Sequence, residues 1–533
     1  MNSHISRHLT FFFFGTVLVV GLWILPDYGV SWDEDIQRQH GRVAWDYVNE
    51  KLGIEAERMV PEHEFRSYEY NFHGTLFQMV NQLIEDGFDL RDYREYNLLR
   101  HYTIFGLFYL GLIVFFLTLR EHFGKTGIAL LGAAMLVLSP RIFGNAFFNT
   151  KDIVLMSTFI FAMYSLVKFI DKRNLKWAIL HAVFCALAVN ARLLGIYVTV
   201  FSLLLIILEL AQNKSARTVR FWINIATYTF LTAALTIALW PYLWENTLEN
   251  FFAAFELLSK YSWDGDMRYF NTWVNSQDLP WHYGLAWIHI STPIVYLIFI
   301  WLGVILACRM FIRNLLRKKK FYQDNAGRNI TIFFGCSVVP LAIIVLKDSV
   351  IYDSWRHLFF VYPGLLILGL LGFEAARKRL EASRLRNLPA IMIGMSLMTT
   401  LAFTVFNHPF QHTYINIPDD ELEKRFDIDY WGVSYYEALN QLAEADHRDT
   451  IIVNMTNYPG FVNVSMLPLE KRNRFKRTFD RSEADYLLTN FRFKAGLQPY
   501  LKNQYPMKTE DEFLSLSTSN SKVIGVYRLH GKP

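Results

Sequence analysis

The segment LTFFFFGTVLVVGLWILPDYGVSWDEDIQRQH (residues 9–40) joins an apolar run directly to three consecutive acidic residues. The run covers residues 9–26 and is long enough to cross a hydrocarbon core of about 30 Å as a helix. Asp33, Glu34 and Asp35 follow closely after its end. The segment therefore predicts a membrane-spanning helix that brings carboxylates to one membrane face.

The rest of the chain shares this apolar character. Of its 533 residues, 53% are hydrophobic and only 19% are charged, which is too apolar for an ordinary soluble protein. We expect a mainly α, polytopic transmembrane helix bundle with about eleven spans. The expected spans are residues 9–26, 98–119, 126–146, 152–170, 175–192, 193–211, 220–240, 286–308, 330–347, 357–375 and 389–406.

Basic residues indicate the orientation of these spans. DKRNLK (171–176), RNLLRKKK (313–320) and ARKRLEASRLRN (376–387) all fall on the cytoplasmic side if the N-terminus is cytoplasmic and the first run is retained as an anchor. The net charge of +5 is thus spread over short loops, which argues against nucleic-acid binding. The three cysteines have neither a disulfide nor a metal-site pattern.

This orientation predicts two parts. Residues 1–406 form a transmembrane catalytic module with outer loops at 27–97 and 241–285, and residues 407–533 form a small extracytoplasmic α/β domain. Periodicity predicts helices at 35–53, 73–86 and 435–445, and strands at 450–454, 484–490 and 521–529.

Two acidic sites face outward in this arrangement. Asp33 and Glu34 suit either a general base or oxygen ligands for a divalent cation, although a solvated acidic loop is an alternative. The second site is Asp152, at the end of SPRIFGNAFFNTKD (139–152) and in the first turn of the next span. Helix capping alone would explain a carboxylate there.

Cations are expected on the same face. Arg141 and Lys151 flank the second acidic site, Arg192 lies in AVNARLLGIY (188–197), and Arg356 and His357 begin a late span. A cation at membrane depth costs about 2.5–3.5 kcal/mol on insertion scales, so it usually has an anionic partner. The partner is a carboxylate or a phosphate; the alternatives are snorkelling for the arginines and simple packing for His357.

Carboxylates that activate a nucleophile, beside cations that hold a phosphate, meet the needs of glycosyl transfer from a polyprenyl-phosphate sugar. Nucleotide sugars are cytoplasmic, so an outward-facing transferase needs a lipid-carried donor. With phosphate as the leaving group, one carboxylate base suffices for a single inverting displacement.

The motifs resemble those of the C-type (GT-C) integral-membrane glycosyltransferases, in particular the bacterial relatives of dolichyl-phosphate-mannose protein mannosyltransferases, glycosyltransferase family 39. The resemblance spans most of the chain and is carried by SWDE (31–34), SPRIFGNAFFNTKD (139–152), YDSWRHLFFVYPG (352–364), HPFQHTYIN (408–416) and DIDYWG (427–432).

The resemblance implies a multi-pass protein of the bacterial inner membrane with a polyprenyl-phosphate-linked sugar as donor. Asp33 would be the base, Glu34 its support and Asp152 the second acidic residue; the remaining candidates would bind the donor phosphate, namely Arg356, His357, Arg192, Arg141 and Lys151. Members differ in metal use, so Mg²⁺ or Mn²⁺ stays open, and we expect no obligatory metal.

The acceptor would be a hydroxyl of a lipid, glycan or protein. The tail lacks a recognisable β-trefoil insert of the eukaryotic enzymes, and its Tyr414, Asn416, Tyr430 and Trp431 either line an acceptor cleft or dock the domain. Two other classes stay open. A secondary transporter would place its acids near the membrane midplane, and a non-catalytic envelope-assembly scaffold would tolerate loss of Asp33.

Overall fold

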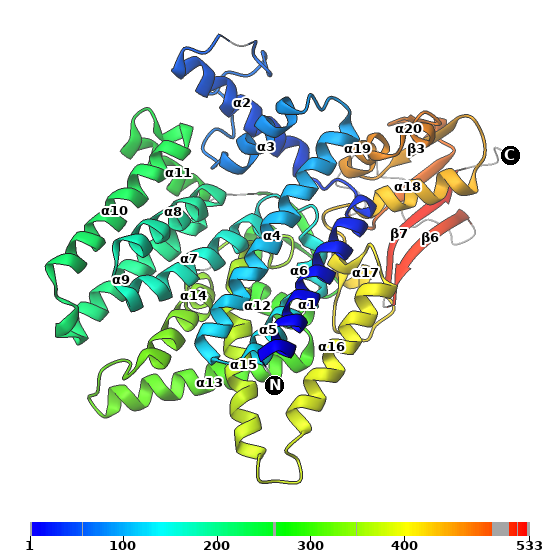
Figure 1. Cartoon of the computed structure of the whole chain (residues 1–533). Coiled ribbons are helices and arrows are strands. Elements are labelled where there is room, and N and C mark those ends of the chain that lie inside the picture. The colour runs from blue at the N-terminus through cyan, green and yellow to red at the C-terminus, as the bar shows by residue number, and fades with distance from the viewer. Residues whose placement is uncertain are drawn as a thin grey trace.

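The computed structural model describes residues 3–55, 57–259, 263–347, 349–492, 511–519 and 521–529. Helices dominate this part of the chain, and a small sheet lies near the C-terminal end, which confirms the expected mainly α fold (Figure 1). Nine of the described helices are long and apolar enough to cross a membrane. They contain α1 (Ser3–Ile24), α4 (Tyr93–Phe123), α7 (Asp152–Lys172), α9 (Ile196–Gln212), α10 (Val219–Leu239), α13 (Ile294–Leu316), α14 (Asn325–Lys347), α15 (Tyr362–Leu380) and α16 (Leu388–Phe406).

Two shorter apolar helices account for the other expected spans. They are α5 (Thr126–Val137) and α8 (Leu175–Ala191). The run expected at 126–146 ends early because Ser139 and Pro140 start a separate short helix, α6 (Pro140–Asn145). Likewise, Pro293 separates α12 (Tyr283–Ser291) from α13, so that span begins later than expected.

The centre of the bundle is formed by α7 and α15. Their most apolar 18-residue windows are 89% and 83% buried, against 17% for α1, so α7 and α15 are enclosed by protein while α1 faces outward. Close packing requires small residues here. A Cβ on Gly303 of α13 would lie 1.8 Å from the carbonyl oxygen of Leu368 in α15, so only glycine allows this approach.

The outer loops form helices of their own. The first loop contains α2 (Glu34–Leu52) and α3 (Leu76–Gly87), as periodicity predicts, and the later loop contains α11 (Thr247–Ser259) and the hairpin of β1 (Asp266–Tyr269) and β2 (Thr272–Asn275). In Figure 1 these helices lie at the top, whereas the basic α13–α14 and α15–α16 loops lie at the opposite end.

The tail contains the expected α/β elements. Its five-stranded sheet has the order β4-β3-β5-β7-β6, with β3 parallel to β4 and β5, and β7 antiparallel to β5 and β6. The predicted strands correspond to β3 (Ile451–Met455), β5 (Tyr486–Thr489) and β7 (Ser521–Arg528), and the predicted helix to α18 (Ser434–Ala445). Short elements that periodicity missed complete it: α17 (Leu422–Arg425), α19 (Tyr458–Met466), α20 (Leu469–Arg472), β4 (Phe475–Arg477) and β6 (Glu512–Thr518).

The tail is joined to the membrane module by specific hydrogen bonds. The Asn463 amide donates to the carbonyl oxygen of Val30 (2.8 Å) and accepts from its N–H (2.9 Å). Tyr458 donates to Asp35 at the start of α2 (2.8 Å). These contacts hold the tail against the turn that joins α1 to α2.

Candidate active site

Hydrogen bonds to the tail hold the turn between α1 and α2, and Asp33 lies at the end of this turn. Besides the Val30 contacts, the N–H of Trp32 donates to the carbonyl oxygen of Trp431 in the tail (3.2 Å). Asp33 is the residue that precedes the first turn of α2. Its carboxylate is therefore carried by a backbone that the tail restrains.

Asp33 and its neighbour Glu34 have different environments. Glu34 is fully buried: its Oε1 accepts from the N–H of Ser31 (2.7 Å) and its Oε2 lies 2.9 Å from Nε2 of His101. The Asp33 side chain is 33% exposed, and its carboxylate accepts no hydrogen bond from the described residues. Of the two predicted residues, Asp33 is the one that a substrate could reach.

Asp152 lies at the start of α7 but does not cap the helix. Oδ1 of Asn149 does so, because it accepts from the N–H of Asp152 (2.8 Å) and that of Lys151 (3.3 Å). The Asp152 carboxylate instead accepts from Nδ2 of Asn149 (3.0 Å) and pairs with Arg192. The capping alternative therefore fails to account for the carboxylate of Asp152.

Arg356 connects the two acidic sites. Its Nη1 lies 3.6 Å from a carboxylate oxygen of Asp33 and 3.6 Å from one of Asp152, while Nη2 lies 3.6 Å from Asp353. The side chain is 4% exposed and lies over the rings of Tyr352 and Trp431. Nε and Nη1 are buried and donate no hydrogen bond to a described residue. A buried cation with unused donors is costly, and an anion would satisfy it.

The backbone that presents Arg356 is strained. Asp353 and Ser354 have φ values of 54° and 65°, in the left-handed region that non-glycine residues seldom occupy. They are held there because Asp353 accepts from Arg492 of the tail (2.7 Å) and the N–H of Ser354 donates to Tyr283 (3.0 Å). Such strain is concentrated at functional sites.

The remaining predicted cations lie at different places. Lys151 is half-buried; burial lowers its pKa to about 8, although Asp33 acts in the opposite direction. His357 is buried, and its ring meets Tyr352 edge to face at 4.7 Å. Arg141 is outside the cluster: it donates to the carbonyl oxygen of Tyr414 (3.2 Å) and forms no ion pair with any described residue.

Sequence reasoning missed several residues that shape the site. Asn145 accepts from Nε1 of Trp431 (3.0 Å) and from Asn149 (3.0 Å), which links the tail to the second acidic motif. Asn145, Asn149 and Asp353 all stand inside the quoted motifs, so their position in those motifs was the available signal. Arg492 had no such signal, because nothing near it in the sequence suggests contact with Asp353.

Metal binding has no obvious set of ligands. Among the residues that the structure describes, no three His, Cys, Asp or Glu side chains gather as a metal site requires. Asp33 and Asp152, the carboxylates that would serve as oxygen ligands, instead share the guanidinium of Arg356.

Comparisons with known proteins give a family match and several structural likenesses. ArnT from Cupriavidus metallidurans bound to undecaprenyl phosphate has 12% identity and a TM-score of 0.48, with 97% of this chain and 98% of that chain covered. The Archaeoglobus fulgidus oligosaccharyltransferase in the apo form has 10% identity and a TM-score of 0.49, with 89% and 65% covered.

No curated protein matches the chain. The family model of dolichyl-phosphate-mannose-protein mannosyltransferases matches residues 100–260, a segment that includes Lys151, Asp152 and Arg192 of the cluster. This match confirms the predicted resemblance: over residues 100–260 the chain is similar to the dolichyl-phosphate-mannose-protein mannosyltransferases.

Proposed function

We propose that the protein is an inverting glycosyltransferase that moves a sugar from a polyprenyl-phosphate-linked donor to a hydroxyl acceptor. The family match supports a donor of this kind. The observation that carries the proposal is the position of Arg356, which lies between Asp33 and Asp152 with buried donors that no described residue satisfies. A phosphate has the geometry and charge that such a guanidinium binds.

Asp33 is the proposed base. It removes the proton of the acceptor hydroxyl, whose oxygen attacks the anomeric carbon. The bond from that carbon to the phosphate oxygen breaks, and its electron pair leaves with the phosphate. Partial exposure lets a hydroxyl approach the carboxylate within the 2.6–3.2 Å that proton transfer requires. Glu34 supports the base by holding the turn through Ser31 and His101.

The cations stabilise the departing phosphate. Arg356 and Lys151 place positive charge near the carboxylates, and Asp152 orients Arg192 at the same point. Such charge replaces a general acid, because a phosphate leaves as an anion without being protonated. We expect no obligatory Mg²⁺ or Mn²⁺ for this reason. His357, which lies beside Tyr352, would then act at the edge of the phosphate site, whereas Arg141 lies outside it.

We infer the orientation in the membrane from the basic loops. They lie at the end opposite α2, α3 and the tail, and the positive-inside bias supports a cytoplasmic N-terminus and an active site on the outer side. In a bacterium this is the outer face of the inner membrane, where a flipped lipid-linked sugar would be available. Membrane lipids and a lipid, glycan or protein acceptor are the expected partners.

The test uses the full chain in sealed vesicles that contain polyprenyl-phosphate sugars and a hydroxyl acceptor. The wild-type protein should release polyprenyl phosphate, and Asp33→Asn should reduce release by about 10²–10⁴-fold, the usual contribution of a general base. Asp35→Asn is the matched control: it changes a carboxylate two residues further on, whose contacts are to Tyr93 and Tyr458, and should lower release by a few-fold at most. Unchanged release by Asp33→Asn would refute the assignment of the base. Flux of an unmodified substrate across the vesicles would instead support a transporter.

A further inference from the structure

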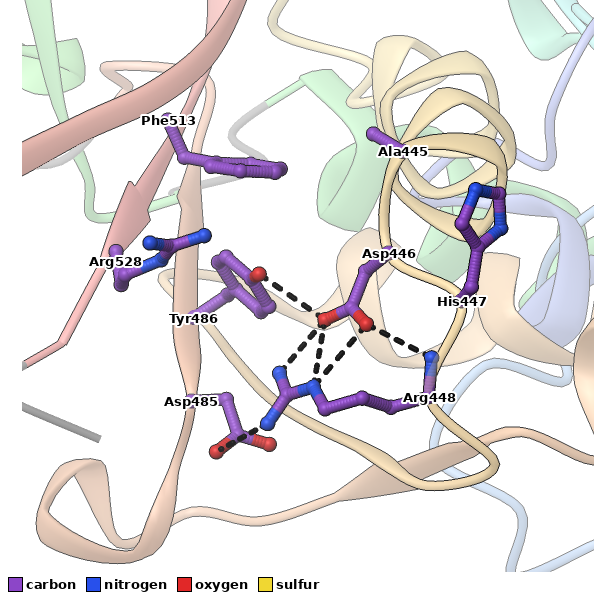
Figure 2. A pocket seen from close by; sticks show the side chains of 8 residues that line it. All are labelled: Ala445, Asp446, His447, Arg448, Asp485, Tyr486, Phe513 and Arg528. Carbon is purple, nitrogen blue, oxygen red and sulfur yellow. Dashed lines mark hydrogen bonds and ion pairs between the residues drawn. The ribbon is translucent and has the colours of Figure 1, made fainter. Parts of the chain in front are cut away.

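A second candidate site lies in the tail, outside the Arg356 cluster. An open cavity of about 250 Å³ is formed where the end of α18 meets β5, β6 and β7 (Figure 2). It is lined by Ala445, Asp446, His447, Arg448, Asp485, Tyr486, Phe513 and Arg528. Aromatic rings, carboxylates and guanidinium groups therefore border one cavity.

The register of the sheet brings the aromatic residues of the cavity close to Arg528. Tyr486 of β5 is paired directly with Arg528 of β7, so their side chains lie on the same face of the sheet. The register of β6 shifts between Glu512 and Leu514, and Phe513 occupies this irregularity. Such a bulge redirects one side chain, here toward Tyr486, whose ring centroid lies 5.0 Å from that of Phe513.

The two carboxylates of the cavity, Asp446 and Asp485, already have partners within the tail. Asp446 accepts from Nε (3.0 Å) and Nη2 (2.6 Å) of Arg448 and from the hydroxyl of Tyr486 (3.0 Å). Asp485 accepts from the N–H of Ile452 (2.8 Å) and lies 3.4 Å from Arg448. Hydrogen bonding from Arg448 lowers the pKa of Asp446 to about 2, so this carboxylate stays ionised.

Arg528 differs from Arg448 because no carboxylate among the described residues pairs with it. It forms no ion pair with any described residue, and its guanidinium carbon lies 4.8 Å from the ring centroid of Phe513 and 5.9 Å from that of Tyr486. Arg528 is exposed and lines the cavity, so its guanidinium can donate to a planar anion there (Figure 2).

We propose that this cavity binds one sugar ring that carries a carboxylate or a phosphate group. The volume falls below the roughly 300 Å³ at which pockets for drug-sized ligands begin, so it suits a single ring. The ring would lie against Phe513 and Tyr486, and its anionic group would meet Arg528. A hydroxyl would donate to Asp485, because Asp446 already accepts from Arg448 and Tyr486. The proposal goes beyond sugar transfer, because it assigns the tail a glycan-binding site of its own.

The experiment is saturation-transfer NMR on the full chain in detergent, with glucuronic acid, glucose 6-phosphate and glucose as probes. The two anionic sugars should receive saturation on their ring protons, and the one that binds tighter identifies the anionic group. Arg528→Gln should weaken binding about tenfold or more, through loss of a charge-assisted contact. Phe513→Leu should weaken it severalfold while keeping an apolar side chain in β6.

Two further variants are the controls. Arg477→Gln removes the same charge from β4, where Arg477 donates to the carbonyl oxygen of Phe461, and should bind normally. Asp33→Asn should also bind normally, so a failure of the transferase proposal leaves this result intact. Equal binding by Arg528→Gln and wild type would overturn the proposal, as would equal binding of glucose. Inorganic phosphate that binds while neither anionic sugar shows ring saturation would overturn it as well.

Discussion

Asp33 and Glu34 are neighbours in the sequence, yet their surroundings are opposite. Both oxygens of Glu34 are engaged, by Ser31 and His101, and the side chain is sealed from solvent. Asp33 is one-third exposed and faces Arg356 without a hydrogen bond from the described residues. One acidic motif therefore divides into a residue that holds the turn and a residue that is available for chemistry.

Two buried arginines show the same contrast. Arg100 is matched at hydrogen-bond distance by Glu85 (2.5 Å) and Gln78 (2.6 Å). Arg356 has three carboxylates around it, but each is 3.6 Å away, beyond a normal hydrogen bond. Nη2 of Arg100 is also buried without a hydrogen-bond partner. The contrast therefore lies in the distances: Arg100 has a carboxylate at hydrogen-bond distance, whereas Arg356 has none among the described residues.

The largest expected effect distinguishes Asp33 from Glu34, by turnover for the first and by stability for the second. Asp33→Asn should lower turnover by about 10²–10⁴-fold with little change in thermal stability. Glu34→Gln should lower stability by about 1–3 kcal/mol, because it weakens a buried hydrogen bond, and should change turnover much less. Transfer assays and thermal unfolding of the same preparations measure both quantities. If Glu34→Gln loses turnover while Asp33→Asn keeps it, the roles are reversed.

The next largest expected effect distinguishes Arg356 from Arg100, by donor affinity for the first and by stability for the second. Arg356→Gln should weaken donor binding by about 10–100-fold, as expected for loss of a charge-assisted phosphate contact. Arg100→Gln should instead lower stability by about 3 kcal/mol, since it breaks a buried ion pair, with donor affinity near that of wild type. Binding of a labelled lipid-linked sugar and thermal unfolding measure these effects. Unchanged donor affinity in Arg356→Gln would return this residue to a structural role.

The fold was largely predictable because each span carries its own hydrophobic signal. The exceptions have local causes: Pro140 and Pro293 interrupt apolar runs, and a hydropathy pattern does not register such breaks. Short elements such as β4 and α20 escaped because three or four residues are too few to show a period.

The residue types of the site were predictable from the sequence, but which side chains contact one another was less so. Asp33, Asp152 and Arg356 come together as the motif order suggests. Arg141 stands in the same motif as Asp152, yet it turns toward Tyr414, because a sequence does not show which way a side chain leaves a short helix. Contacts over long separations, such as Arg492 with Asp353, depend on the docked tail and have no local signal.

The pH dependence of donor binding tests whether Lys151 belongs with Arg356. Burial lowers the pKa of Lys151 to about 8, so its ammonium is charged below that pH and loses its charge above it. Donor affinity should therefore fall severalfold as the pH rises from 7 to 9. Lys151→Arg should remove most of this dependence, because a guanidinium stays charged in this range. An equally steep profile in Lys151→Arg would assign the effect to another group.

The smallest expected effect concerns the hydrogen bond between the tail and the start of α2. Tyr458 donates to Asp35, two residues beyond the proposed base, so Tyr458→Phe removes one hydrogen bond without changing charge or packing volume. It should lower stability by about 0.5–1.5 kcal/mol and turnover by a few-fold, since Asp33 would be held less firmly. Tyr102→Phe is the control, because Tyr102 is exposed on α4 and its hydroxyl bonds to no described residue. If Tyr458→Phe loses turnover and Tyr102→Phe keeps it, docking of the tail positions the base; equal turnover in both would make the tail a separate module.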